Sequence, residues 1–318
     1  MFIIRIREIG GTTRGALWII LGMALVAVGD NYTPIVTEHM GLWQFHALRS
    51  AMVIPVALIF ALATGRLTSV WPVSLRRVSE RSLLSMVAMV MYFAALPAVG
   101  IAQAAAGLFT SPIWAVLISA IFFGERVGVR HIVAVVMGFA GVCLVLEVGK
   151  QPIQPMALAA VAGGLAWALS VIWTRRHCRG ESAICLAIWQ FTALMLAGLA
   201  GLVLSPWIIP ALSGIEGTEF VTQPIRATSG WILFVLFLIG IARISAAASQ
   251  AVGYQSGDAS VVALFDLSFL FWAPFFAWVI WGKTVSHSMA AGMVLIVIAG
   301  ALAIWSDDRA RAAVVRGR

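Results

Sequence analysis

Residues 107–146 read GLFTSPIWAVLISAIFFGERVGVRHIVAVVMGFAGVCLVL, and residues 263–305 read ALFDLSFLFWAPFFAWVIWGKTVSHSMAAGMVLIVIAGALAIW. Each stretch is an apolar run with a proline, then a glycine beside a charged residue, then a second apolar run with spaced small residues. The hairpin residues between the two runs are Gly124, Glu125, Gly282 and Lys283. Two apolar hairpins at corresponding places in a chain are typical of membrane proteins built from internal repeats.

Composition indicates the same class of protein. The chain is 62% hydrophobic and only 11% charged, with a mean hydropathy of +1.00. Soluble domains carry about 25% charged residues. Little sequence remains outside the apolar runs, which excludes a separate soluble catalytic domain.

Ten apolar runs are long enough to cross a bilayer, which requires about 20 residues in a helix. These expected spans are residues 15–35, 42–63, 82–99, 102–123, 131–148, 156–174, 182–204, 229–251, 259–281 and 286–305. We therefore expect an all-α membrane protein with ten transmembrane helices.

Basic residues are distributed unevenly over the loops between these spans. With the N-terminus placed inside, sixteen arginines fall on the inner side and only three basic residues fall outside. This asymmetry satisfies the positive-inside rule. Both termini are predicted to be cytoplasmic, in a multi-pass protein of the inner membrane. The net charge of +8 is then assigned to topology and lipid headgroups, and no nucleic-acid partner is expected.

The topology predicts an inverted repeat of two five-helix halves. It places the Gly124 hairpin on the cytoplasmic side and the Gly282 hairpin on the outer side. A second correspondence aligns Arg49 with Gln190. The expected segments are a cytoplasmic N-terminal segment (1–14), a first repeat (15–148), an outer linker (149–155), a second repeat (156–305) and a basic cytoplasmic tail (306–318).

With these features the chain resembles the drug/metabolite transporter superfamily, in particular its EamA-like ten-helix members. The matching residues are Gly29, Asn31, Arg49, Pro112, Gly124, Glu125, Arg126, Gly141, Ala166, Trp167, Ala168, Gly282 and Gly292. The resemblance covers residues 14–306 and implies that the first, third, fourth, sixth, eighth and ninth helices line a cavity. Lys283 departs from the glutamate that is usual after the second hairpin glycine. Pro274 lies one helical turn later than the first-half spacing predicts.

Four charged residues fall within the expected spans, where each costs about 2.5–3.5 kcal/mol near the bilayer centre. They are Asp30, Arg49, Arg243 and Asp266. Their depths, taken from a rise of about 1.5 Å per residue, predict two pairs: Asp30 with Arg49, and Arg243 with Asp266. These charges are either static pairs that hold helix register or parts of a substrate pathway.

Polar and aromatic residues near mid-membrane complete the predicted substrate pathway. Its residues are Asn31, Tyr92, Thr110, Ser111, Trp114, Trp167, Arg243 and Asp266. Interhelical packing explains each aromatic side chain taken alone. Together they predict a partly aromatic pocket with a few polar anchors.

These patterns favour a secondary transporter that moves a small organic metabolite, amino-acid-like or drug-like, by alternating access, with export as the favoured direction. A non-transporting sensor or scaffold is the alternative, and an intramembrane aspartyl protease built on Asp30 and Asp266 is disfavoured by their depths. We expect no enzyme, cofactor or metal site, because the sequence lacks Walker, Gly-x-Ser-x-Gly and His-Glu-x-x-His motifs. The expected partners are a small-molecule substrate and the bilayer. Protons, with Asp266 as the coupling residue, and a second copy of the chain in a homodimer are further candidates.

Overall fold

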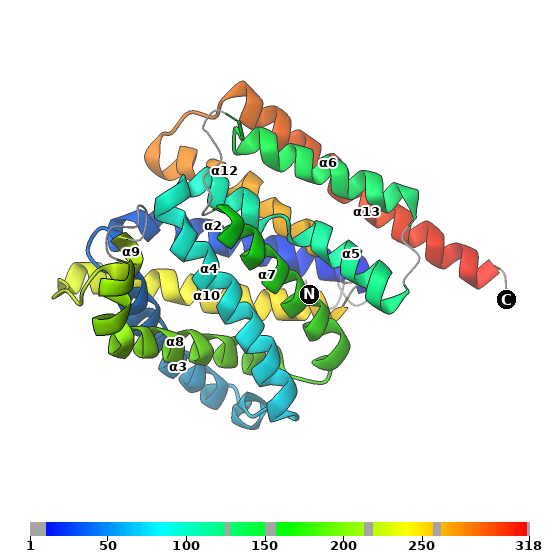
Figure 1. Cartoon of the computed structure of the whole chain (residues 1–318). Coiled ribbons are helices and arrows are strands. Elements are labelled where there is room, and N and C mark those ends of the chain that lie inside the picture. Colours follow the sequence, from blue (N-terminus) through cyan, green and yellow to red (C-terminus); the bar gives the residue numbers. More distant parts are fainter. Residues whose placement is uncertain (1–10, 125–127, 150–156, 213–218, 257–261, 317–318) are drawn as a thin grey trace.

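The computed structural model describes residues 11–124, 128–149, 157–212, 219–256 and 262–316. Over these residues the chain is helical, with no β-strand. The long helices, labelled as in Figure 1, are α2 (Gly11–Thr37), α3 (Leu42–Ala63), α4 (Leu75–Leu108), α5 (Ser111–Phe123), α6 (Val129–Val145), α7 (Ala157–His177), α8 (Ala183–Leu212), α10 (Gly230–Ser256), α12 (Phe269–Trp281) and α13 (His287–Arg316). Short helical segments are η2 (Leu67–Val70), α9 (Glu219–Thr222) and η3 (Ala263–Ser268).

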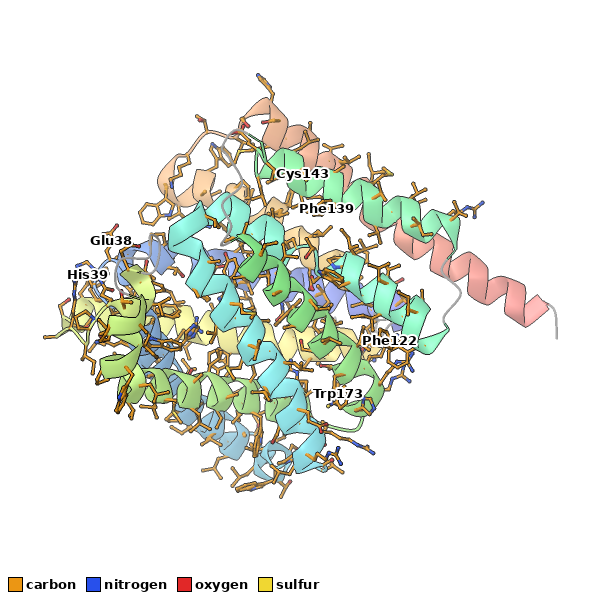
Figure 2. The ribbon with its side chains drawn as sticks, in the orientation of Figure 1. Glu38, His39, Phe122, Phe139, Cys143 and Trp173 are labelled. Atoms are coloured by element: carbon orange, nitrogen blue, oxygen red, sulfur yellow. The ribbon has the colours of Figure 1, made fainter. Side chains whose placement is uncertain are left out.

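The helices are suited to a bilayer in length and in surface chemistry. Among the described residues, eight segments are long and apolar enough to cross a membrane. Two shorter apolar stretches, Ile132–Val145 in α6 and His287–Leu302 in α13, accompany them. Large apolar side chains lie exposed on the outside of the bundle, such as Phe122 at 76% exposure (Figure 2). Such a surface matches hydrocarbon rather than water. The protein is a multi-pass membrane protein.

The main difference from the expected spans concerns the third and fourth runs. The sequence predicts a break between residues 99 and 102, but α4 continues through this segment to Leu108. The alanine-rich sequence at residues 102–106 explains the continuity, because alanine has the highest helix propensity. The helix is interrupted instead at Phe109 and Thr110, directly before Pro112 in the first turn of α5. Proline suits a helix start because its missing N–H would lack an intrahelical partner there.

The two halves of the chain are packed into one another. The most extensive helix contacts are α4 with α7, α2 with α10, α6 with α13, and α3 with α8 (Figure 1). Each pair joins one helix from the first half of the chain to one from the second half. The centre of the bundle is therefore surrounded by side chains from both halves.

The two hairpins of the predicted repeat have the same local geometry. The helices α5 and α12 are each 13 residues long and end at Gly124 and Gly282, with φ of 62° and 63°. Glycine adopts this left-handed conformation without the steric cost that other residues meet. Lys283 is exposed directly after the second glycine. Glu125 lies outside the described residues.

Spaced small residues let α6 and α13 cross at close range. A Cβ atom built on Gly292 would lie 2.7 Å from the carbonyl oxygen of Gly141, and one built on Gly141 would lie 2.9 Å from that of Gly292. Glycines at a crossing allow the backbones of membrane helices to approach closely. Gly141 and Gly292 belong to two separate hairpins in the sequence and meet in one interface in the structure.

The ends of the bundle can be followed from labelled side chains. Glu38 and His39, at the turn after α2, lie on one side of the molecule, and Phe122 and Trp173 lie on the other (Figure 2). The turn between α2 and α3 and the turn after α5 are therefore at opposite ends of the bundle.

Candidate substrate cavity

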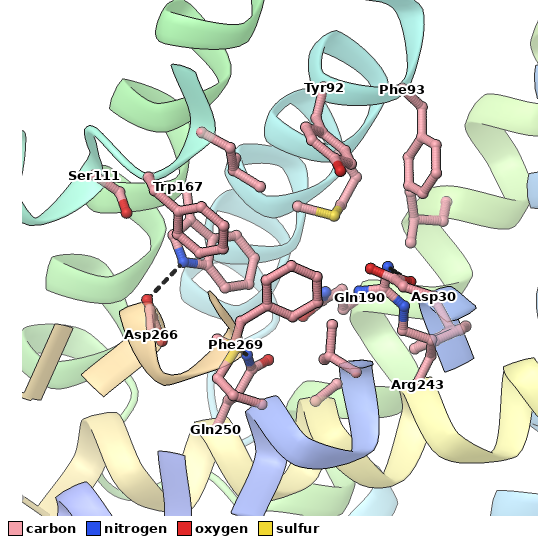
Figure 3. Close-up of a pocket in the computed structure, with 18 of the residues that line it drawn as sticks. Asp30, Tyr92, Phe93, Ser111, Trp167, Gln190, Arg243, Gln250, Asp266 and Phe269 are labelled. Atoms are coloured by element: carbon pink, nitrogen blue, oxygen red, sulfur yellow. Dashed lines mark hydrogen bonds and ion pairs between the residues drawn. The ribbon is translucent and has the colours of Figure 1, made fainter. Parts of the chain in front are cut away.

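A cavity lies among the helices at the middle of the bundle (Figure 3). Its unfilled space, including the opening, is about 800 Å³, and the centre of a water molecule can occupy about 70 Å³ of it. The charged and polar residues that line it are Asp30, Arg49, Ser111, Gln190, Arg243, Gln250 and Asp266. The aromatic residues that line it are Tyr92, Phe93, Phe109, Trp167, Phe191 and Phe269. A largely apolar pocket with a few polar groups is typical of small-molecule sites.

One end of the cavity contains an ion pair between Asp30 and Arg243. The guanidinium Nη2 of Arg243 donates to Oδ1 of Asp30, and both side chains are largely buried. The predicted pairing of Asp30 with Arg49 is thus replaced by one that joins α2 to α10. Within the described residues, no ion pair links Asp30 to Arg49.

The packing of α2 against α10 explains this partner. Gly22 of α2 lies against Ala246 and Gln250, whereas Gly29 lies against Ile239 and Ala242. Residues with higher numbers in α2 therefore contact residues with lower numbers in α10, so the two helices are antiparallel. Asp30 and Arg243 then fall within about one helical turn of each other, a gap that a long arginine side chain spans. Depths counted from span ends carried no information about which helices are neighbours.

Arg49 lies beside this pair without belonging to it. It is 3% exposed, and its Nη2 donates to Nδ1 of His46 at 3.1 Å. Its guanidinium carbon is 4.6 Å from the ring centroid of Phe45 and 5.5 Å from that of Phe191. Stacking on aromatic faces stabilises a cation where a carboxylate partner is lacking. Its Cγ atom packs over Gly240 of α10, where a Cβ atom would lie at 3.2 Å.

The other end of the cavity holds Asp266, which is 1% exposed. The indole Nε1 of Trp167 donates to Oδ2 at 3.0 Å. The hydroxyl of Tyr254 lies 2.7 Å from Oδ1 and 2.9 Å from Oδ2. The predicted partner Arg243 is paired instead with Asp30, so neutral donors surround Asp266. Its position in the 3₁₀ segment η3, directly before α12, turns the carboxylate toward α7 and α10.

The two carboxylates do not form an aspartyl dyad. Asp30 and Asp266 lie at opposite ends of the cavity (Figure 3), and each has its own donors. A catalytic dyad requires carboxylates close enough to share a proton. The arrangement therefore offers two separate charged positions with an aromatic region between them.

The other residues of the predicted pathway divide into two groups. Tyr92, Ser111 and Trp167 line the cavity. Asn31 is not among the lining residues, and its amide donates to the carbonyl oxygens of Ala27 and Ala273. Thr110 and Trp114 are also absent from the lining. The indole of Trp114 donates to the hydroxyl of Thr110 at 3.1 Å. Their roles in transport remain predictions.

Several lining residues were missed by the sequence analysis. Gln250 lies in the stretch AAASQAVG, where a lone amide among small apolar residues was the available signal. Phe109 lies in the break between α4 and α5, and Phe269 is the first residue of α12 after η3, so both line the cavity from places where the helix changes. In the described parts of the chain no group of three or more metal-binding side chains occurs. The three cysteines are free, and burial raises the pKa of Cys178, in the turn after α7, to about 11.

Comparison with known proteins places this cavity in a family context. The EamA-like transporter family matches residues 13–147. Residues 13–147 form an EamA-like transporter domain. A riboflavin transporter of Rhizobium johnstonii is 24% identical over 302 residues, which cover 93% of this chain and 92% of that protein. A riboflavin transporter of Vibrio cholerae is 24% identical over 212 residues, covering 66% of this chain and 64% of that protein. One solved crystal structure, at 20% identity, has the same fold with a TM-score of 0.74, covering 93% of this chain and 98% of that one.

The EamA-like domain supplies only part of the cavity. From it come the lining residues Asp30, Arg49, Tyr92, Phe93, Phe109 and Ser111. From the rest of the chain come Trp167, Gln190, Phe191, Arg243, Gln250, Asp266 and Phe269. The protein is a membrane transporter, and its central cavity requires residues from inside and outside the EamA-like domain.

Proposed function

We propose that this protein is a secondary transporter that carries a small organic metabolite through the central cavity by alternating access. The observation that carries the proposal is the cavity itself, where buried charged groups and aromatic rings from both halves surround space at mid-bundle. Charged groups are expensive inside a membrane and mark substrate pathways. A sensor or scaffold would need no such space, and a dry, fully packed centre would have favoured it.

The proposed architecture is ten transmembrane helices in two inverted five-helix repeats, with both termini cytoplasmic in the inner membrane. Two 13-residue helices that end in left-handed glycines support the repeat. The packing pairs also support it, since α2 with α10 and α7 with α4 are the same contact with the halves exchanged. The α6 and α13 pair would supply the two remaining spans. Turns after α2 and after α5 at opposite ends of the bundle agree with the loop charges.

Polar contacts join the two halves of the chain at each end of the bundle. At the end near Glu38, the amide of Gln44 exchanges hydrogen bonds of 2.7 and 3.0 Å with the backbone of Arg226. At the opposite end, the carboxylate of Glu181 accepts from the backbone N–H groups of Val73 and Ser74 at 2.9 and 2.8 Å. Hydrogen bonds contribute about 1 kcal/mol each. Contacts of this strength can open and close in turn, as alternating access by rocking halves requires.

For the substrate we propose a flavin-like heterocycle, with riboflavin as the first compound to test. The names of the two relatives suggest it, and the cavity chemistry suits it. Tyr92, Phe109, Trp167 and Phe269 offer rings for a planar aromatic system, and the polar ends offer hydrogen bonds. Amino-acid-like and other drug-like solutes belong in the same panel. Export is the direction proposed, so transport must be measured in both orientations.

Proton coupling through Asp266 is part of the proposal. Its partners Trp167 and Tyr254 are neutral, so a proton can bind the carboxylate without breaking an ion pair. An inward proton gradient should then accelerate transport by the wild-type protein. Asp266→Asn should still exchange substrate across the membrane but lose the acceleration. Equal acceleration in the variant would contradict this role.

The transport proposal is tested with purified protein in liposomes. Wild-type protein should exchange riboflavin across the membrane and gain thermal stability from it, by about 2.7 kcal/mol at 100 times the dissociation constant. Two tryptophans provide a matched pair of variants. Trp167→Phe removes a cavity residue and a donor to Asp266, so it should weaken both riboflavin exchange and thermal stabilisation. Trp231→Phe changes a side chain that is 66% exposed and outside the lining, so it should retain both. Absence of exchange for every compound in the panel would refute transport.

A further inference from the structure

The Asp30 end of the cavity holds buried polar atoms that lack partners. Within the described part of the chain, these are Nε of Arg49, Nε of Arg243 and Oε1 of Gln190. Arg49 and Gln190 are 3% and 6% exposed, and all three residues line the cavity. Asp30, Gln190 and Arg243 lie together at this end (Figure 3). A buried donor or acceptor without a partner costs about 1–3 kcal/mol, which a suitable ligand would recover.

The charges at this end are unbalanced. Two guanidinium groups, of Arg49 and Arg243, lie near the single carboxylate of Asp30. Arginine has no acceptor atom, so its hydrogen bond with His46 requires Nδ1 of the imidazole to accept. This leaves an excess of donors and positive charge at this end of the cavity. Among these unpartnered atoms, Oε1 of Gln190 is the acceptor.

We infer that this end of the cavity binds an imide edge of the substrate, in which two carbonyl oxygens flank an N–H group. The carbonyl oxygens would accept from Arg49 and Arg243, and the N–H would donate to Oε1 of Gln190. The inference rests on the proposed transport of a flavin-like heterocycle and assigns its orientation. A site that offers two donors and one acceptor in a fixed arrangement selects a ligand by its geometry as well as by its charge. A single charged group does not provide this selectivity.

The opposite end of the cavity suits the rest of such a substrate. An ionised carboxylate has about four acceptor positions. The indole N–H of Trp167 and the single hydroxyl proton of Tyr254 occupy two of those on Asp266, or three if the hydroxyl proton is shared between Oδ1 and Oδ2. At least one position is left for a hydroxyl donor of a polyol chain. A simple carboxylate ligand would also be attracted to the two arginines, but it has no N–H between its oxygens and would leave Gln190 unsatisfied.

The test compares riboflavin with its derivative methylated at the imide nitrogen. Methylation keeps both carbonyl oxygens but removes the N–H and places a methyl group against a buried acceptor. Wild-type protein should bind the methylated compound about tenfold more weakly or worse, measured by flavin fluorescence quenching in detergent. A riboflavin analogue with a changed methyl group on the benzenoid ring should bind within about threefold of riboflavin. This comparison needs no variant and is independent of folding defects.

Two glutamines that line the same cavity provide the matched variants. Gln190→Met removes the proposed acceptor, so riboflavin and the methylated compound should bind with nearly equal affinity. Gln250→Met removes a side chain whose Nε2 donates to the sulfur of Met23, so the tenfold preference should persist. Arg49→Met should weaken the binding of both compounds by a similar factor and leave the ratio of their affinities unchanged.

The outcomes separate this inference from the transport proposal. Binding of riboflavin without any preference over the methylated compound would overturn the imide assignment and leave transport intact. A tenfold preference that survives in Gln190→Met would overturn it too, and would assign the N–H to another acceptor. No binding of riboflavin by the wild-type protein would refute both the substrate and the orientation.

Discussion

Asparagine in place of Asp30 should destabilise the protein more than methionine in place of its partner Arg243. Asp30→Asn leaves the guanidinium groups of Arg49 and Arg243 buried near each other with no carboxylate. Arg243→Met leaves Asp30 beside Arg49, which is already within electrostatic range. The second arginine can therefore replace the first, whereas Asp30 has no substitute at this end of the cavity.

The size of the effect follows from burial. Removing one partner of a buried ion pair costs about 3–5 kcal/mol. The side chains of Asp30 and Arg243 are 21% and 14% exposed, so water in the cavity moves the expected loss toward about 3 kcal/mol for Asp30→Asn. Two neighbouring like charges repel by roughly 1–4 kcal/mol at an effective dielectric constant of about 20. Because Arg243→Met creates no such repulsion, its free energy of unfolding should fall by only about 1 kcal/mol.

The assay is thermal unfolding of monodisperse protein in detergent, followed by tryptophan fluorescence. At about 2–4 °C per kcal/mol, the two single variants should differ by about 4–8 °C in melting temperature. The double variant Asp30→Asn/Arg243→Met removes the repulsion, so it should melt above Asp30→Asn alone. Equal losses in the two single variants, or additive losses in the double variant, would refute the reasoning.

Three further predictions concern packing, the Asp266 end and a thiol. Gly141→Leu should destabilise the α6–α13 crossing by about 1–3 kcal/mol through overpacking. The control Gly124→Ala meets no atom within 4 Å and should lose only about 1–2 kcal/mol from its left-handed backbone. Tyr254→Phe removes a donor to Asp266 and should cost about 1.5–3 kcal/mol in the same unfolding assay. Cys178 should remain unlabelled by maleimide at pH 7 in folded protein and react on unfolding, because its raised pKa keeps the thiol protonated and its side chain is buried; rapid labelling of folded protein would contradict this.

The sequence predicts a bundle of apolar helices suited to a bilayer, and the structure confirms it, because hydrocarbon imposes a simple rule on local composition. The run at residues 42–63 coincides with α3, and the two hairpin glycines adopt the left-handed conformation that their places after apolar helices favour. The break between the third and fourth runs was misplaced because a single apolar window cannot distinguish a long, continuous helix from two successive spans.

The charged residues were found from the sequence, but their partners were not. An aspartate or arginine inside an apolar run is visible as such, so Asp30, Arg49, Arg243 and Asp266 were all identified. The pairing of Asp30 with Arg243 depends on the antiparallel packing of α2 against α10, which joins residues more than 200 positions apart in the sequence. The partners of Asp266 depend on the turn of η3.

Sequence by itself determined that the protein is a helical membrane protein with buried charges. Only tertiary structure decided that Asp30 binds Arg243, that Asp266 is held by neutral donors and that Gln190 faces the same space, because pairing in a bundle is decided by helix neighbours rather than by depth.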